Sequence, residues 1–136
     1  MKNKSLTKDY IVRGGIRLAA LQVLFDQGGY ADVVREAQEI VELVSKALIR
    51  HLGAEPARVH DVSAQLAELQ SRLQAEQHAG LQTLIDISRE LRRDRELAFY
   101  GTEDLTPSEF YSKKDAERAL SHAKQAVTFV VEVVGA

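Results

Sequence analysis

The 136-residue sequence has no cysteine and no tryptophan, one methionine and two prolines. Without cysteine, neither a disulfide framework nor a thiolate metal site can form, and a reducing compartment is the natural setting. The chain also lacks any run of about 18 apolar residues, the length that a membrane-spanning helix needs. Its start, MKNKSLTKDY, lacks the apolar segment of a secretion signal. We therefore expect a soluble, cytoplasmic protein that makes no contact with a membrane.

A strong charge of either sign is missing as well. The 18 Lys and Arg residues nearly balance the 20 Asp and Glu residues, which leaves a net charge of -2. Such a chain has no overall electrostatic attraction to nucleic acid, so contact with a polynucleotide would need a local basic patch. With 45% hydrophobic residues, the chain can bury enough apolar surface to fold as one domain over residues 1–136.

The longest regular pattern runs from Tyr30 to Leu52, and it predicts one long amphipathic helix. The apolar residues of this segment recur at steps of three and four, which places them on one broad arc of a helix. The arc consists of Val33, Val34, Ala37, Ile40, Val41, Val44, Ala47 and Leu48. An arc this wide needs packing partners on two sides, so the segment is predicted to be the central helix of a bundle.

Four further helices are expected. The first is capped by Ser5 or Thr7 and ends at Gly28-Gly29. The others run from Asp61 to about Glu76, from about Leu81 to Phe99, and from Lys113 to about Val134. Gly80 is expected to break the helical pattern, and Gly14-Gly15 to fray the first helix or to admit another backbone closely. Short connections predict antiparallel neighbours. The fold class is therefore all-α, an antiparallel up-and-down bundle of four long helices plus a shorter one.

The end of the chain leaves one alternative open. VTFVVEVV is rich in β-branched residues, which favour strands. However, it continues a helical pattern that starts at Ala116, so we prefer the helix to a terminal strand. The start of this last helix is better marked, because Ser112 and Asp115 resemble a capping box with a shorter acid than usual.

Motifs for metal or cofactor chemistry are not found. The histidines lie on four different segments, at His51, His60, His78 and His122, and no ExxH or HExxH pairing occurs. A helical metal site would therefore have nothing local to build on. Neither glycine pair follows a predicted strand or fits a phosphate-binding loop. We expect no metal and no cofactor.

Arg95 is the most unusual residue of the predicted fourth helix, because it projects from the apolar arc. That arc consists of Leu81, Leu84, Ser88, Leu91, Arg95 and Ala98. A guanidinium buried without a partner costs several kcal/mol. Arg95 can reach the rim, pair with a carboxylate such as Glu42, Asp94 or Asp104, or face a cleft or subunit interface where a phosphate or a partner's acid meets it.

A dense basic patch surrounds Arg95. Arg89, Arg92 and Arg93 lie beside it, and Tyr100 and the longest loop follow. Such a patch is most often only solvated, yet its position next to Arg95 makes Arg92 a candidate ligand-binding residue.

Four segments carry a recurring set of features, in this order: YADVVREAQEIVELVSKALIRHLG, VHDVSAQLAEL, RRDRELAFYGTE and EFYSKKDAERALSHAKQAVTFV. The features are a tyrosine and then A-Q before the E-x-x-x-K of Glu42 and Lys46, the loop His60-Asp61 that opens the next helix, and an aromatic-rich loop leading to Tyr111 and Asp115-Ala116. Taken together, these segments resemble the HEPN domain (higher eukaryotes and prokaryotes nucleotide-binding) over roughly residues 10 to 134.

The resemblance implies a helical bundle that is usually dimeric and found beside small nucleotidyltransferases in toxin–antitoxin pairs and defence systems. Many active family members are metal-independent ribonucleases that pair arginine and histidine of an R-x4-6-H motif across a dimer cleft. Here Arg95 occupies the arginine position, but Tyr100 stands where the histidine would be. A tyrosine with an ordinary pKa of about 10 is a poor general base at neutral pH. It can still donate a hydrogen bond to a phosphate or stack on a base.

A literal R-x5-H match occurs earlier in the chain, at Arg72 and His78. It lies one element before the position of the family motif. Six residues on a helix correspond to about 120° around its axis, so the two side chains share no face while the helix continues. We expect a solvated helix end there.

Two functions remain open. We favour a dimeric binding and interaction module that docks a minimal nucleotidyltransferase and holds a nucleotide or RNA. Its ligand-binding residues would be Arg95, Tyr100, Arg92, Glu42, Lys46 and His60. The alternative is a metal-independent endoribonuclease toxin in which Arg95 acts with Tyr100, or with His60 in place of the missing histidine. From the residues alone, Glu42 and Lys46 are expected to form an exposed ion pair, and His60 to be hydrogen-bonded locally at a helix start.

Overall fold

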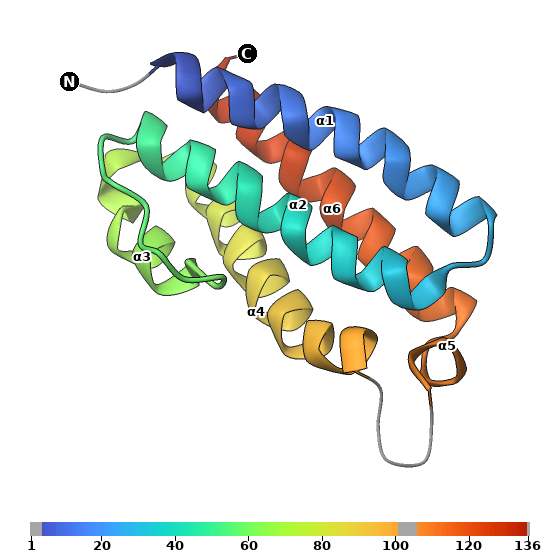
Figure 1. The fold of residues 1–136 in the computed structure, drawn as a ribbon. Coiled ribbons are helices and arrows are strands. Elements are labelled where there is room, and N and C mark those ends of the chain that lie inside the picture. The colour runs from blue at the N-terminus through green and yellow to red at the C-terminus, as the bar shows by residue number, and fades with distance from the viewer. Residues whose placement is uncertain (1–3, 101–105, 136) are drawn as a thin grey trace.

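Every regular element in the part of the chain that the structure describes is a helix. The computed structural model describes residues 4–100 and 106–135, and for residues 94–100 it describes the backbone alone. The elements are α1 (Lys4–Asp26), α2 (Tyr30–His51), α3 (Ser63–Glu68), η1 (Gln70–Arg72), η2 (Ala75–Gln77), α4 (His78–Tyr100), α5 (Pro107–Phe110) and α6 (Lys113–Val134). Consecutive long helices run in opposite directions, and α1 begins at the end of the bundle where α6 finishes (Figure 1). The predicted all-α bundle with four long helices is confirmed.

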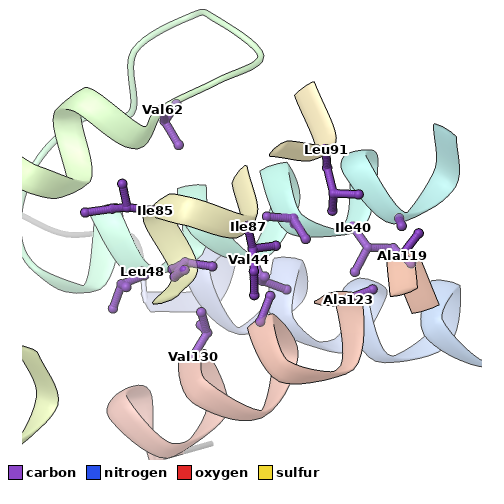
Figure 2. Close-up of a cluster of buried hydrophobic side chains, with 14 of the residues drawn as sticks. Ile40, Val44, Leu48, Val62, Ile85, Ile87, Leu91, Ala119, Ala123 and Val130 are labelled. Atoms are coloured by element: carbon purple, nitrogen blue, oxygen red, sulfur yellow. The ribbon is translucent and has the colours of Figure 1, made fainter. Parts of the chain in front are cut away.

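The central position predicted for the segment from Tyr30 is confirmed by the packing of α2. This helix contacts α1, α4 and α6. Figure 2 shows side chains of α2, α4, α6 and the start of α3 meeting in the core, among them Ile40, Val44, Leu48, Val62, Ile85, Ile87, Leu91, Ala119, Ala123 and Val130. Burying a large apolar side chain contributes about 1.5–3 kcal/mol. The contacts of α2 therefore join the other three long helices into one core.

The start of α1 differs from the prediction. The helix begins at Lys4, so Ser5 and Thr7 lie inside it and neither is its cap. Thr7 is buried together with Ile11 and Leu21, because the buried face of α1 extends almost to its first turn. The predicted end is confirmed, since α1 finishes at Asp26 and Gly28 adopts a φ of 78°.

Gly14 lies where α1 packs against α2. A Cβ atom at this position would approach Cγ1 of Val44 to 2.6 Å, whereas one at Gly15 would meet nothing within 4 Å. Val44 is fully buried and β-branched, so it has little freedom to move away. The group that approaches Gly14 closely is thus a side chain, and the expectation of a neighbouring backbone is wrong.

The predicted third helix is shorter than expected. α3 ends at Glu68, and the two short 3-10 turns η1 and η2 replace the remainder. Leu73 and Gln74 between those turns have extended backbone, with ψ values of 157° and 153°. Leu66 and Leu73 are both buried. The bent segment therefore buries the apolar side chains whose spacing predicted a continuous helix.

The break predicted at Gly80 is wrong. α4 begins at His78 and runs through Gly80. A Cβ atom at Gly80 would collide with the ring of Phe129 from α6. This glycine therefore permits close packing of α4 on α6 and does not end a helix.

The last part of the chain is helical, and the alternative of a terminal strand is wrong. The capping box of α6 is confirmed, since the Asp115 carboxylate accepts a hydrogen bond from the backbone N–H of Ser112 at 2.8 Å and the Ser112 hydroxyl accepts one from the backbone N–H of Asp115 at 3.2 Å. The preceding polar loop contains the unpredicted α5, which starts with a similar box between Thr106 and Glu109.

Among the described helices, none combines the length and the apolar character that crossing a bilayer requires.

The two neighbouring glycines of α1 give a matched test of the α1–α2 contact. Gly15→Ala should raise the free energy of unfolding by up to about 1 kcal/mol, the usual gain of alanine over glycine in a helix. Gly14→Ala should lower it by about 1–3 kcal/mol, because the added methyl group overpacks against Val44. Urea unfolding followed by circular dichroism measures both changes. Equal stabilisation by the two substitutions would show that the helices are not packed this closely.

Candidate functional site

Three of the predicted ligand-binding residues meet beside α2. Glu42 and Lys46 lie one turn apart on this helix, and His60 lies in the loop before α3. Oε2 of Glu42 lies 2.9 Å from Nζ of Lys46, and its Oε1 lies 3.0 Å from Nδ1 of His60. The side-chain amide of Gln38 donates to the same Oε1 at 3.5 Å. Glu42 therefore joins the loop to α2.

Two expectations for this cluster need correction. Glu42 and Lys46 form the predicted ion pair, but their side chains are only 19% and 21% exposed. His60 bonds to a residue 18 positions away instead of locally. The local hydrogen bond at the start of α3 is made by its neighbour Asp61, whose carboxylate accepts from the backbone N–H of Ser63 at 2.9 Å.

Asp61 fixes the other side of the loop. Its Oδ1 also accepts a hydrogen bond from the hydroxyl of Ser88 on α4, at 2.9 Å. Burial would raise the pKa of Asp61, but the hydrogen bonds from Ser63 and Ser88 and the charge of Arg89 lower it overall. Because His60 faces α2 and Asp61 faces α4, the loop that carries His60 is held between these helices.

The ionisation of Glu42 depends on the same contacts. Burial would raise its pKa, but hydrogen bonds and charge interactions with Lys46 and His60 more than offset that effect. The pKa of Glu42 therefore lies below the ordinary value of 4.5. At neutral pH Glu42 is ionised, so it can hold Lys46 and orient His60 but cannot donate a proton.

Two concavities meet at this cluster. One, of about 410 Å³, lies between α2 and the loop, and the other, of about 310 Å³, lies between α1 and α2. Tyr10, Glu42, Lys46 and His60 line both of them. The other charged lining residues are Arg13, Arg17, Glu39, Arg50, Glu55 and Arg58. We call the two concavities together the α1–α2 groove.

Tyr10 places an aromatic ring among the cations of the groove. The guanidinium carbons of Arg13 and Arg50 lie 5.8 and 5.9 Å from the centre of its ring, within the range of cation–π attraction. Sequence reasoning missed this side of the groove. The steps of three and four between Tyr10, Arg13 and Arg17 do indicate a shared helix face, but nothing local links that face to Lys46.

The other predicted site residues belong to α4. Arg92 is half-buried on this helix, and the side chains of Arg95 and Tyr100 lie outside the described residues, so their roles stay predictions. Two members of the predicted basic patch have partners within the protein. Nε of Arg89 donates to the hydroxyl oxygen of Ser63 at 3.2 Å, and Arg93 lies 4.0 Å from Glu90. The α1–α2 groove, in contrast, gathers arginine and lysine side chains that the sequence analysis did not group together.

The literal R-x5-H pair contacts backbone carbonyls. Nη1 of Arg72 donates to the carbonyl oxygen of Leu52 at 2.9 Å, and Nε2 of His78 lies 3.3 Å from that of Leu73. Arg72 lies in η1, whereas His78 begins α4. These contacts fit a role in holding the chain between α2 and α4.

A comparison with protein families decides the relationship that the sequence indicated. The family model of the HEPN domain matches residues 7–134. The chain belongs to the HEPN domain family. The match covers the α1–α2 groove and reaches the last residue of α6, and HEPN domains are nucleotide-binding or ribonuclease-like. A search of curated proteins and of solved structures found no match.

The stability of this HEPN domain should depend on pH through Glu42. Its pKa is lower in the folded protein than the unfolded value of 4.5, so the ionised group stabilises the fold above about pH 4.5, and this contribution is lost as the pH falls through the folded pKa. Glu42→Gln should therefore lower the free energy of unfolding at neutral pH, and its difference from wild type should shrink below about pH 4.5.

Urea unfolding between about pH 3 and pH 7 measures this difference. Glu55→Gln is the matched control, because the Glu55 side chain is 81% exposed although it also pairs with an arginine. The control should cost little at any pH, as exposed ion pairs contribute little. A Glu42→Gln difference that stays constant over the whole range would contradict the assignment.

Proposed function

We propose that this HEPN domain is a binding module whose α1–α2 groove holds the phosphate group of a nucleotide or of RNA. The observation that carries the proposal is the gathering of five cationic side chains around two joined concavities, beside a tyrosine ring. Guanidinium and ammonium groups pair with phosphate oxygens through charge-assisted hydrogen bonds. An aromatic face can take a base by stacking. Together these groups suit a ligand with both a phosphate and a base.

The charge balance of the groove supports reversible binding. Its three carboxylates, on Glu39, Glu42 and Glu55, oppose five cations. Lys46 uses one of its three N–H donors on Glu42, which leaves donors for a phosphate oxygen. Arg13 is exposed. A phosphate can therefore enter the groove without first breaking the contact between Glu42 and Lys46.

We include a homodimer and a minimal nucleotidyltransferase partner in this proposal, in a toxin–antitoxin or defence-type system. The support for these two parts is that the chain belongs to the HEPN domain family, for which the resemblance implies that arrangement. Neither part is needed for the groove to bind a phosphate. They can therefore fail separately from ligand binding.

One contact favours ribonuclease activity as a second candidate. Nδ1 of His60 lies 3.0 Å from a carboxylate oxygen of Glu42, and the His60 side chain is 54% exposed. A carboxylate that fixes one imidazole nitrogen orients the other for proton transfer. In this alternative Nε2 of His60 would accept the proton of an RNA 2′-hydroxyl as its oxygen attacks the adjacent phosphorus, and Lys46 would stabilise the phosphate charge. The bond from phosphorus to the 5′-oxygen would break, which leaves a 2′,3′-cyclic phosphate, and the departing 5′-oxygen would take a proton from solvent.

Removing two cations of the groove tests ligand binding. Arg13→Ala/Lys46→Ala should weaken binding of a fluorescent single-stranded RNA at least about tenfold, because hydrogen bonds to charged groups contribute about 1.5–3 kcal/mol each. The affinity of the double variant should also fall less steeply with salt, because it releases fewer counterions. Fluorescence anisotropy at several salt concentrations measures both effects. Lys124→Ala, an exposed lysine on α6, is the control, and an equal loss in the control would contradict the proposal.

Incubation of RNA with the protein in a metal chelator separates the two functions. As a binding module, the wild-type protein should leave the RNA intact on a high-sensitivity gel. Cleavage that His60→Gln abolishes would instead establish the Glu42–His60 pair as catalytic. Cleavage that depends on Arg95 and Tyr100, tested with Arg95→Ala and Tyr100→Phe, would assign the chemistry to the end of α4.

A further inference from the structure

A further concavity, of about 450 Å³, lies at the end of the bundle where α1 begins and where α2 and α6 finish (Figure 1). We call it the end cavity. The described residues that line it are Lys4, Thr7, Lys8, Arg50, His51, Val134 and Gly135. Three of them are cations, one carries an imidazole, and none is a carboxylate. The end cavity therefore suits an anion, whereas the α1–α2 groove balances its cations with three carboxylates.

The two lysines of the end cavity do not help α1 to form. Lys4 and Lys8 are exposed, and they lie one turn apart in the first two turns of the helix. Positive charge at a helix N-terminus opposes the helix dipole, and like charges one turn apart repel each other. The first turn of α1 has no acidic residue to offset them. A bound anion would remove both unfavourable interactions.

The helix ends beside the end cavity already have hydrogen-bond partners within the chain. At the end of α2, the carbonyl oxygens of Leu48, Ile49 and Arg50 accept from backbone N–H groups that follow, at 2.9, 3.1 and 3.0 Å. Near the end of α6, the carbonyl oxygen of Val131 accepts from the N–H of Gly135 at 2.8 Å. These carbonyl groups therefore do not require a lysine as a partner.

Arg50 connects the end cavity to the α1–α2 groove, because it lines both. Its guanidinium carbon lies 5.9 Å from the centre of the Tyr10 ring in the groove. Its Nη1 and Nη2 lie 3.4 and 3.3 Å from the carboxylate of Glu55, whose side chain is 81% exposed. These distances are long for a charge-assisted hydrogen bond, so a phosphate could take the place of Glu55 at little cost. Positive charge thus continues from the groove into the end cavity.

We propose that the end cavity is a second phosphate subsite, and that it takes a later phosphate of a single RNA strand whose first phosphate lies in the α1–α2 groove. The proposal rests on the proposed function and narrows its ligand to a strand. Arg17 of the groove and Lys4 of the end cavity are thirteen residues apart on α1, about 20 Å of helix. One nucleotide cannot span this distance, whereas a strand carries a phosphate at each nucleotide.

The groups along this path match those of proteins that bind single strands. Such proteins combine a positively charged groove, which follows the backbone, with aromatic rings on which bases stack. Here the ring of Tyr10 lies beside Arg50, between the cations of the groove and those of the end cavity. The strand would therefore pass Tyr10 and Arg50 on its way to Lys4 and Lys8.

The length of the RNA tests the second subsite. Lys4→Ala/Lys8→Ala should weaken binding of a 5′-phosphorylated RNA of about eight nucleotides about fivefold, because exposed charge contacts each contribute modestly. Its affinity for a 5′-phosphorylated dinucleotide, held in the groove, should stay within about twofold of wild type. For the longer RNA, the slope of log affinity against log salt should become less steep by about 1.4, the value for two phosphates of a single strand. Fluorescence anisotropy with labelled RNA measures each affinity.

Lys113→Ala/Lys114→Ala is the matched control. It removes two exposed lysines from the first turn of another long helix, α6, at the opposite end of the bundle (Figure 1). The control should bind both ligands as the wild type does. An unchanged affinity of Lys4→Ala/Lys8→Ala for the longer RNA, or an equal loss in the control, would overturn the second subsite alone. If Arg13→Ala/Lys46→Ala binds both lengths as the wild type does, the proposed function fails, and the second subsite fails with it.

A stability measurement separates ligand binding from a structural role of the lysines. The urea midpoint of Lys4→Ala/Lys8→Ala should not fall below that of the wild type, because both lysines oppose the dipole of α1. A lower midpoint together with an unchanged affinity for the longer RNA would assign them to the ends of α2 and α6 and overturn the proposal.

Nuclear magnetic resonance of the wild-type protein gives a readout that needs no substitution. The dinucleotide should shift the backbone amide resonances of Arg13 and Lys46. The longer RNA should shift these and, in addition, those of Lys8, His51 and Val134. Shifts in the groove alone with the longer RNA would overturn the second subsite and leave the proposed function standing. Shifts in neither place with either ligand would overturn both.

Discussion

The burial of α2 between α1, α4 and α6 is the constraint on which the site depends. Because the apolar arc of α2 is used in the core, its polar residues project on the remaining side, beside the flank of α1 and the loop before α3. Glu42 and Lys46 belong to that side, and Tyr10 of α1 borders it. The groove thus lies beside the buried core of the bundle, which favours a fixed geometry for ligand contacts.

The electrostatics of the groove follow from one ionised carboxylate. Glu42 holds the ammonium group of Lys46 and one nitrogen of His60, and these contacts lower its own pKa. The same carboxylate limits the positive charge that a ligand meets. On the other side of the loop, Asp61 contacts Ser88 of α4. Phosphate binding and proton transfer would therefore both depend on how this loop is anchored between two helices.

The sequence predicts the parts of this structure that depend on local patterns. The bounds of α2 follow from apolar periodicity, and the start of α6 follows from its capping box. Gly80 was misjudged because its partner, Phe129, is distant in the sequence, so glycine as a helix breaker could not be distinguished from glycine as a packing contact. The candidate site likewise combines a contact that is local in the sequence with contacts that are not. The contact of Glu42 with Lys46 is local, whereas its contact with His60 and the nearness of Tyr10 depend on how the helices and the loop pack.

A nuclear magnetic resonance titration would test the central claim most directly. A short single-stranded RNA would be added in chelator to protein labelled with nitrogen-15, and the backbone amide resonances followed to saturation. We predict that the resonances of Tyr10, Arg13, Lys46 and His60 shift together along one binding curve. Saturable shifts confined to residues 92–100, with the groove unchanged, would contradict the assignment of the ligand site to the α1–α2 groove.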